Sequence, residues 1–224
     1  MPNERSKIAE SVAYWFFRLN GCFTIINFIV HRDTHDRIHS QITDIDIFAV
    51  RFPYRRELAT SDKPMKDHDI FSNSKIDIIL SEVKAGKCNL NSSWTKKENL
   101  IKILNALGAF KEDETETVAD SLIKSGCYEN QTHRIRIIAI GSEKNQEINP
   151  KVEQLTFEEI LNFIYERIDE YKKVKSSHHQ WDEMGQKLYN YATTLSREEF
   201  INLMLDQIKE KETQQTETEE KEEP

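Results

Sequence analysis

Two apolar runs in this 224-residue chain carry charged side chains that a purely structural strand would not need. ITDIDIFAV contains Asp44 and Asp46, and IDIILSEVKAG contains Glu82 and Lys84. Because side chains two residues apart on a strand point to the same face, Asp44 shares a face with Asp46, and Glu82 shares one with Lys84. If the two strands are neighbours in one sheet, Asp46, Glu82 and Lys84 meet at a single point.

This combination of side chains predicts a metal site that hydrolyses phosphodiester bonds. Carboxylates that crowd together raise each other's pKa, and a hard divalent cation relieves their repulsion. Mg²⁺ (or Mn²⁺) typically takes one or two carboxylates together with waters and substrate phosphate oxygens. Such an ion activates a bound water and stabilises charge on a phosphorus-centred transition state. Asp46 and Glu82 are expected to bind the ion, and Lys84 to orient the water or neutralise the developing oxyanion.

The rest of the chain alternates helical and strand patterns that would position these residues in one mixed α/β domain. Runs rich in β-branched and aromatic residues predict strands over residues 22–30, 42–52, 76–84 and 133–141. Apolar residues at helical spacing predict helices over residues 4–20, from about Ser93 or Thr95 to Gly108, near 115–125, and over 155–174, 181–194 and 197–208.

Several residues predict where these helices begin and end. Ser93 or Thr95 is expected to cap the second helix, and Gly108 to end it. Thr156 and Glu159 have the spacing of a capping box at the start of the long helix that follows Pro150.

Alternation along the strands predicts which side chains enter the core. Ile45, Ile47 and Ala49 are expected on the face opposite the two aspartates, whereas Phe48 continues the aspartate face into apolar surroundings. Asp77 begins the next strand on the face opposite Glu82, and a capping or surface role is expected for it.

The composition favours a soluble globular protein, with 38% hydrophobic and 31% charged residues. No apolar run reaches the ~20 residues that a membrane-spanning helix needs, and the N-terminal segment MPNERSKIAE lacks the apolar core of a secretory signal. Cys22, Cys88 and Cys127 are odd in number and lack CxxC spacing, which favours a reducing, cytoplasmic location.

Much of the formal net charge of −8 lies at the C-terminus. Residues 209–224, KEKETQQTETEEKEEP, hold seven Glu and three Lys and are expected to form an acidic disordered tail. This leaves a net charge of −4 for residues 1–208, which neither demands nor excludes a polyanionic partner.

The order and spacing of the charged residues resemble the PD-(D/E)xK nuclease superfamily. Glu82-Val83-Lys84 follows Asp46 at the end of an apolar strand, and the segment AESVAYWFFRLNGCFTIINFIV resembles the first helix and strand of that superfamily. The resemblance covers roughly residues 5–140. It implies a restriction-endonuclease-like core, in which an N-terminal helix precedes a mixed sheet whose second and third strands carry the acidic residues.

The resemblance also implies roles for particular residues. Asp46 is preferred over Asp44 as the metal ligand of the second strand, because two apolar residues and a small one follow it, although Asp44 remains eligible. Glu10 of the first helix and the backbone carbonyl of Val83 are further ligands by analogy. The proline that many members carry before the aspartate is missing here, where Ile45 precedes Asp46.

These considerations predict a fold class and its division along the chain. We expect a mixed central sheet flanked by helices, with a nuclease-like core over residues 1–145. A C-terminal helical region over residues 150–208 would pack on that core.

The predicted activity is a Mg²⁺-dependent endonuclease that acts on nucleic acid, with DNA preferred and with a restriction, defence or repair role. The alternative is a catalytically inactive module of the same fold that binds protein or nucleic acid. A homodimer formed through the C-terminal helices is also compatible with the sequence. Residues that could contact nucleic acid form a basic rim with one stacking aromatic side chain: Lys87, Lys96, Lys97, Arg134, Arg136 and Trp94.

Overall fold

The computed structural model of the chain describes residues 4–31, 41–58, 65–71, 74–176 and 181–209. The helices are α1 (Glu4–Leu19), α2 (Lys97–Leu107), α3 (Glu112–Ser125), α4 (Phe157–Lys175), α5 (Glu183–Thr194) and α6 (Arg197–Lys209). The strands are β1 (Phe23–His31), β2 (Gln41–Arg51), β3 (Ile76–Val83), β4 (Cys127–Glu129), β5 (His133–Gly141) and β6 (Glu153–Thr156). Two short 3₁₀ helices are η1 (Asp69–Phe71) and η2 (Ser92–Thr95).

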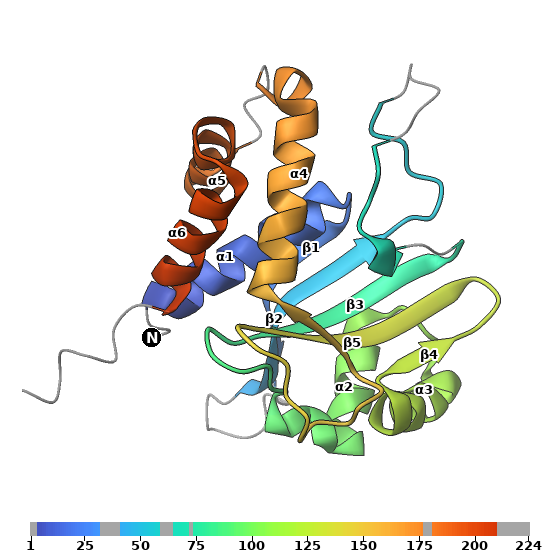
Figure 1. The fold of residues 1–224 in the computed structure, drawn as a ribbon. Helices are drawn as coiled ribbons and strands as arrows, with labels where there is room; N and C mark the ends of the chain where they lie inside the picture. Colours follow the sequence, from blue (N-terminus) through green and yellow to red (C-terminus); the bar gives the residue numbers. More distant parts are fainter. Residues whose placement is uncertain (1–3, 32–40, 59–64, 72–73, 177–180, 210–224) are drawn as a thin grey trace, which may run out of the picture.

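The strands form one mixed sheet in the order β1-β2-β3-β5-β4, and β6 also pairs with β5. The first three strands are antiparallel neighbours, whereas β3 and β5 are parallel. A parallel pair needs a long crossover connection, which α2 and α3 supply on one face of the sheet (Figure 1). The predicted class, a mixed central sheet flanked by helices, is confirmed.

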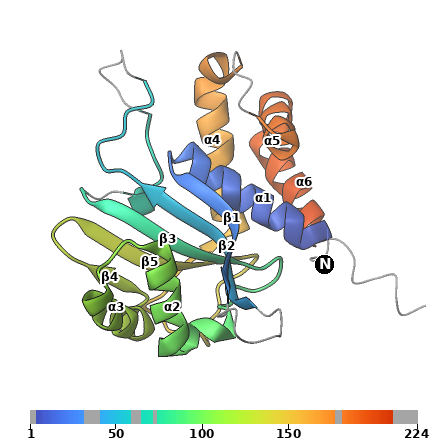
Figure 2. The ribbon, with the colours of Figure 1, turned by 180° about the vertical axis from the view of Figure 1, so that it is seen from behind.

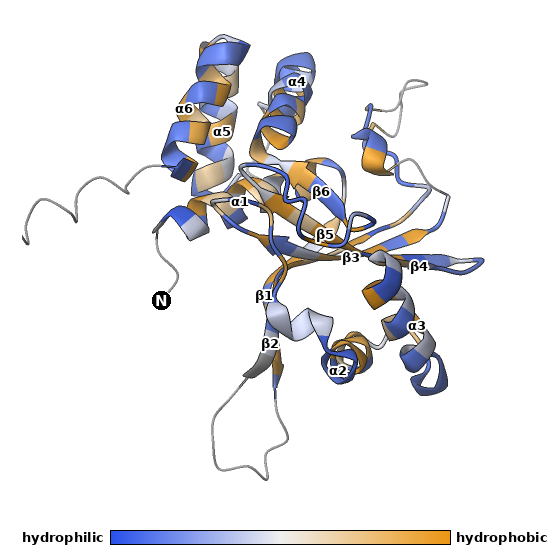
Figure 3. Ribbon diagram, turned by 60° about the horizontal axis from the view of Figure 1, so that its bottom comes forward, coloured by the Kyte–Doolittle hydropathy of each residue, from blue (hydrophilic) through white to orange (hydrophobic). Residues whose placement is uncertain are grey.

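Helices cover both faces of the sheet and form two cores (Figures 2 and 3). The first core lies between the sheet and α1, α4, α5 and α6, and it contains Phe16, Phe157 and Phe200. The second core lies between the sheet and α2 and α3, and it contains Leu100 and Val118. The apolar stripe of each amphipathic helix is therefore buried against the sheet or a neighbouring helix.

Two of the predicted helix-end signals are observed, and one is not. The Thr156–Glu159 capping box is present at the start of α4, and Gly108 ends α2 in the left-handed conformation that glycine favours. The prediction that Ser93 or Thr95 caps α2 is wrong, because both residues lie within η2. Asn91 caps η2 instead, by accepting a hydrogen bond from the backbone N–H of Ser93.

Two short strands, β4 and β6, were not predicted from the sequence. β4 has three residues and β6 has four, so neither carries enough alternation to be recognised. Because β6 belongs to the region after residue 150 and pairs with β5, that region contributes a strand to the central sheet as well as helices that pack on it. The predicted tail lies outside the described residues, apart from Lys209, which ends α6.

β2 changes the face that it presents to the core halfway along its length. Ile45 belongs to the second core, whereas Ile47 and Ala49 belong to the first. The prediction that these three side chains share one face is therefore wrong. The change falls opposite Asn27 of β1, which has a φ of 52°, a left-handed conformation that bends an extended strand.

The longest helix, α4, has 19 residues and is amphipathic. Ile160 and Ile164 are buried, whereas acidic residues occupy its first turn and basic residues its last. Among the described helices, none combines the length and the apolar character needed to cross a bilayer.

Candidate active site at the ends of β2 and β3

The structure brings the predicted acidic residues of β2 and β3 together at one end of the sheet. The antiparallel ladder between β2 and β3 ends at the pair Ile47–Ser81, and Asp46 and Glu82 are the next residues beyond it on their two strands. The Asp46 carboxylate accepts a hydrogen bond of 2.7 Å from the backbone N–H of Val83. Lys84 Nζ lies 2.5 Å from Glu82 Oε1. The convergence predicted for Asp46, Glu82 and Lys84 is therefore observed.

Glu82 is buried far more deeply than an ordinary surface carboxylate. Its side chain is only 4% exposed, and its Oε2 atom has no hydrogen-bond partner. Burial, followed by the negative charge of Asp46, raises the pKa of Glu82 from 4.5 to about 7, against the opposing effect of the Lys84 ammonium. A buried carboxylate oxygen without a partner costs free energy, and a cation is the ligand that best offsets this cost.

Burial and neighbouring charges also shift the pKa values of Glu10 and Asp46. Burial raises the pKa of Glu10, and the negative charges of Asp46 and Asp44 raise it further. Burial also raises the pKa of Asp46, although the Val83 N–H and the Lys84 charge oppose the shift. The charges of Asp46 and Asp44 therefore act on Glu10 of α1, whose role as a metal ligand stays a prediction.

Lys84 keeps its charge within this acidic group. Burial alone would lower the pKa of its ammonium, but the hydrogen bond that it donates to Glu82 and the charges of the nearby carboxylates outweigh burial and raise that pKa. The Lys84 side chain is 44% exposed, so it reaches from Glu82 toward solvent. The arrangement presents a buried carboxylate and a solvent-facing cation side by side.

A polar cluster beside Asp44, which the sequence did not predict, connects η2 and the residue before it to β2 through hydrogen bonds. Ser93 Oγ donates a hydrogen bond of 2.6 Å to Thr43 Oγ1. Asn91 Nδ2 lies 3.3 Å from both Thr43 Oγ1 and Asp44 Oδ1. A hydrogen-bonding side chain at Asn91 therefore orients Asp44, a role that no local motif signals because the two residues lie 47 positions apart.

The prediction that Trp94 stacks on a base is wrong. Trp94 is 2% exposed and belongs to the second core. Its indole Nε1 donates a hydrogen bond to Thr43 Oγ1 at 3.2 Å. An indole needs an apolar environment and one polar partner, and both are available inside the protein.

The prediction that Arg134 and Arg136 belong to a basic rim is also wrong. Both guanidinium groups bind the carboxylate of Asp77, each with an Nη2–Oδ2 distance of 2.7 Å. Asp77 is fully buried, so the surface or capping role expected for it is wrong as well. Asp77 is at the start of β3, opposite Arg51, at the end of the strand away from Glu82.

The remaining predicted basic residues stay at the surface. Lys87 and Lys96 are exposed on the segment that connects β3 to α2. Lys97, in contrast, forms ion pairs with Glu116 and Asp120 of α3. Of the predicted contacts with nucleic acid, Lys87 and Lys96 are thus the two whose positions remain suitable.

The residues present fit a hard cation that takes few protein ligands. Within the described ranges, no three His, Cys, Asp or Glu side chains form a ready-made metal-binding group. Mg²⁺ usually keeps several waters and takes one or two carboxylates. Asp46 and Glu82, with the unpartnered Glu82 Oε2, match that smaller requirement.

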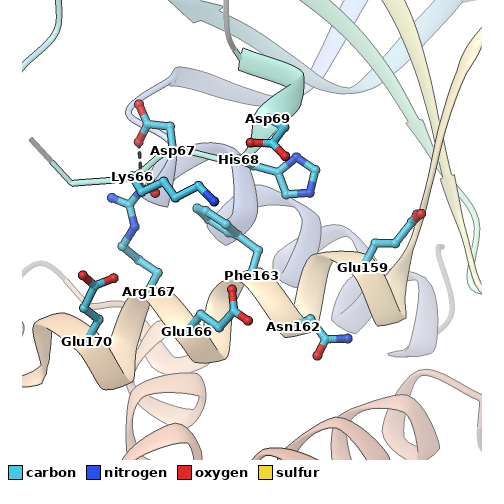
Figure 4. A pocket seen from close by; sticks show the side chains of 10 residues that line it. All are labelled: Lys66, Asp67, His68, Asp69, Glu159, Asn162, Phe163, Glu166, Arg167 and Glu170. Atoms are coloured by element: carbon cyan, nitrogen blue, oxygen red, sulfur yellow. Dashed lines mark hydrogen bonds and ion pairs between the residues drawn. The ribbon is translucent and has the colours of Figure 1, made fainter.

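A separate pocket of about 350 Å³ lies between α4 and the segment before η1 (Figure 4). Its lining is mostly charged: Lys66, Asp67, His68, Asp69, Glu159, Asn162, Phe163, Glu166, Arg167 and Glu170. Arg167 is 1% exposed, and its guanidinium already binds Asp67 at 2.8 Å and the main-chain carbonyl of Lys66. These contacts connect the segment before η1 to α4. None of the residues predicted for catalysis lines the pocket.

Burial of the Glu82 carboxylate predicts that the charge of this residue destabilises the metal-free protein. We expect Glu82→Gln to raise the free energy of unfolding by about 3 kcal/mol above pH 7, because the pKa shift from 4.5 to about 7 measures the penalty. The folded-state pKa is the higher one, so the penalty is absent below pH 4.5 and grows as the pH rises to about 7.

Urea unfolding of the metal-free protein at a series of pH values measures this effect. Glu198→Gln, at an exposed position on α6, serves as the control and should show no such trend. A constant difference between Glu82→Gln and the parent across this pH range would contradict the prediction.

Comparisons with known proteins add no further assignment to this geometry. A scan against protein-family models, a search of curated proteins and a search of solved structures each found no match to the chain.

Proposed function

We propose that this chain is a metal-dependent nuclease of the PD-(D/E)xK, restriction-endonuclease-like superfamily, which hydrolyses phosphodiester bonds, with DNA as the preferred substrate. The observation that carries the proposal is the buried Glu82 carboxylate, whose Oε2 has no partner and whose neighbours are Asp46 and Lys84. A structural role would leave that oxygen hydrogen-bonded, since buried polar atoms in folded proteins almost always are.

The order of the elements supports the same proposal. An N-terminal helix, α1, precedes three antiparallel strands, and a helical crossover leads to the parallel strand β5. The acidic residues lie on β2 and β3, as the resemblance implied.

The residues of the site divide the chemical work. Asp46 and Glu82 would hold the cation, with Asp44, Glu10 and the Val83 carbonyl as the further ligands that the resemblance implies. Bound Mg²⁺ would supply charge stabilisation and an acidified water.

Lys84 would act on the side of the site that faces solvent. Its ammonium donates a hydrogen bond to Glu82 Oε1. Because the side chain is partly exposed, the ammonium could also donate a hydrogen bond to the attacking water or to a phosphate oxygen. The exposed Lys87 and Lys96 would contact the phosphate backbone of the substrate, where each cation adds affinity without reading sequence.

A catalytically inactive module of the same fold is the second candidate. The observation that favours it is the Lys84–Glu82 ion pair, in which the Lys84 ammonium supplies a positive partner for one of the two Glu82 carboxylate oxygens without any metal. In such a module the ammonium would replace the cation permanently, and the surface would serve for binding alone.

Titration with Mg²⁺ and an activity panel separate the two candidates. For a nuclease, we expect calorimetry to detect Mg²⁺ binding by the parent protein and its loss in Glu82→Ala. We also expect cleavage in a panel of single- and double-stranded DNA and RNA only when Mg²⁺ or Mn²⁺ is present. An inactive module would show neither site-specific metal binding nor cleavage.

A further inference from the structure

β1 is an edge strand that differs from the other exposed edges of the sheet. It has nine residues, ends the strand order, and pairs with β2 as its one partner among the described strands (Figure 2). β4, which lies at the far end of that order, has three residues, and its Glu129 is ion-paired with Lys75. Proteins usually protect long edges with charges, prolines or short length, because unpaired N–H and C=O groups attract another strand.

Neither charges, prolines nor short length protect β1 over most of its length. The segment from Phe23 to Val30 contains neither a charged residue nor a proline. Its exposed fractions are 70% for Phe23, 50% for Ile25, 42% for Ile26 and 44% for Ile29. These values leave large apolar side chains in water along a strand whose outer backbone groups have no partner among the described residues.

The exposed side chains lie on both faces of the strand. Ile25 pairs with Phe48, which packs against the second core, whereas Ile26 pairs with Ile47 of the first core. Phe23 makes an edge-to-face contact with Phe52 of the neighbouring chain segment, with ring centroids 5.9 Å apart. A strand docked beside β1 would therefore find apolar side chains above and below its own backbone.

We infer that β1 pairs with β1 of a second copy of this chain, antiparallel across a twofold axis, to form a continuous sheet in a homodimer. Self-pairing of an edge strand is an isologous contact, which a twofold axis produces directly. The bend at Asn27 limits the regular part of the edge, so the pairing centres on Phe23–Ile26.

The charge distribution singles out the β1 edge as the place where a second copy can approach. A chain with a formal net charge of −8 repels its own copy over most of its surface. The uncharged β1 edge is where two copies approach with least repulsion. The C-terminal helix α6 is a less suitable surface for a second copy, since its apolar residues Phe200 and Met204 are buried within the chain.

The available area agrees with a dimer of ordinary size. Phe23, Phe52 and Tyr54, exposed to 70%, 49% and 87%, together offer roughly 400 Å² per copy. A stable interface buries about 800 Å² per partner. The exposed isoleucines and the strand backbone add to this area, so most of an ordinary dimer interface is available along this edge.

Sedimentation equilibrium of the full chain tests this inference, which does not depend on the proposed function. We expect the parent protein to approach twice the 26.4 kDa of one chain as its concentration rises. Ile26→Lys should raise the dissociation constant by about a hundredfold, because it buries a charge within an apolar interface. Val174→Lys is the matched control, since Val174 on α4 is 43% exposed, and it should leave the dissociation constant unchanged.

Hydrogen exchange of the parent protein covers the case in which Ile26→Lys fails to fold. Protection of the β1 amides that do not pair with β2 should rise with protein concentration as the dimer forms. A parent that stays monomeric overturns the inference. So does a dimer that is unaffected by Ile26→Lys, or one whose β1 amides exchange equally fast at all concentrations.

Discussion

Glu82→Gln is expected to lower the rate of Mg²⁺-dependent cleavage by about a thousandfold or more. A metal ion contributes several kcal/mol to the transition state of phosphodiester hydrolysis, and each 1.36 kcal/mol corresponds to a factor of ten in rate. Glutamine keeps the size of the side chain but removes the charge that would hold the cation. Single-turnover cleavage of a labelled DNA duplex, with saturating Mg²⁺, measures the loss.

Lys84→Ala tests the role proposed for the ammonium group of the site, as distinct from its metal-binding carboxylates. We expect cleavage to fall by about 10²- to 10³-fold, as is typical when one preorganised donor is removed from a developing negative charge. Binding of Mg²⁺ should survive this change, because Lys84 is not a ligand of the ion.

Control variants separate these effects from general damage. Glu198→Gln and Lys173→Ala alter exposed residues on α6 and α4 and should cleave at the parent rate. If Asp46→Ala and Lys84→Ala cleave as fast as the parent, the proposed site is not the catalytic one. Because Glu82→Gln is expected to stabilise the metal-free protein, its loss of activity would not reflect unfolding.

Asp77→Ala is expected to reduce the free energy of unfolding by about 3 to 5 kcal/mol, the usual cost of removing one member of a buried ion pair. Asp77 is 0% exposed, and its carboxylate accepts hydrogen bonds from both Arg134 and Arg136. Without it, two guanidinium groups lose their shared counter-charge inside the protein. Arg136 keeps an ion pair with Glu153, which limits the loss.

Thermal and urea unfolding of Asp77→Ala measure this effect. A loss of this size lowers the melting temperature of a protein of about 200 residues by roughly 10 °C. Asp206→Ala, at an exposed position on α6, is the control and should change stability by less than about 0.5 kcal/mol. A destabilisation as small as that of the control would show that the Asp77 cluster is not an important support of the sheet.

Most of the regular elements could be predicted from local pattern. The boundaries of β5 match the prediction, and α4 begins at the predicted capping box, because periodicity and capping are properties of neighbouring residues. β4 and β6 could not be predicted, since three or four residues become a strand only when a partner strand lies beside them.

At the charged strand ends, too, some features follow from the local pattern and others need the tertiary structure. The sequence pattern predicts that Asp46 and Glu82 lie on two strands, but only the antiparallel pairing of β2 and β3, whose ladder ends at Ile47–Ser81, brings the two residues to the same end of the sheet. The face change between Ile45 and Ile47 could not be predicted, because the alternation of β2 carries no sign of the left-handed conformation of Asn27 on the adjacent strand.

By itself, the sequence determined the helices, the long strands and the acidic residues with a nearby lysine, because each depends on residues close together in the chain. The tertiary structure decided which charges are available for chemistry. Arg134 and Arg136 bind Asp77, 57 and 59 positions away, and Trp94 enters the core, whereas Glu82 is buried with one oxygen unpaired. The physical reason is that the partner of a charged or aromatic side chain is chosen by packing and desolvation in three dimensions, which local spacing does not encode.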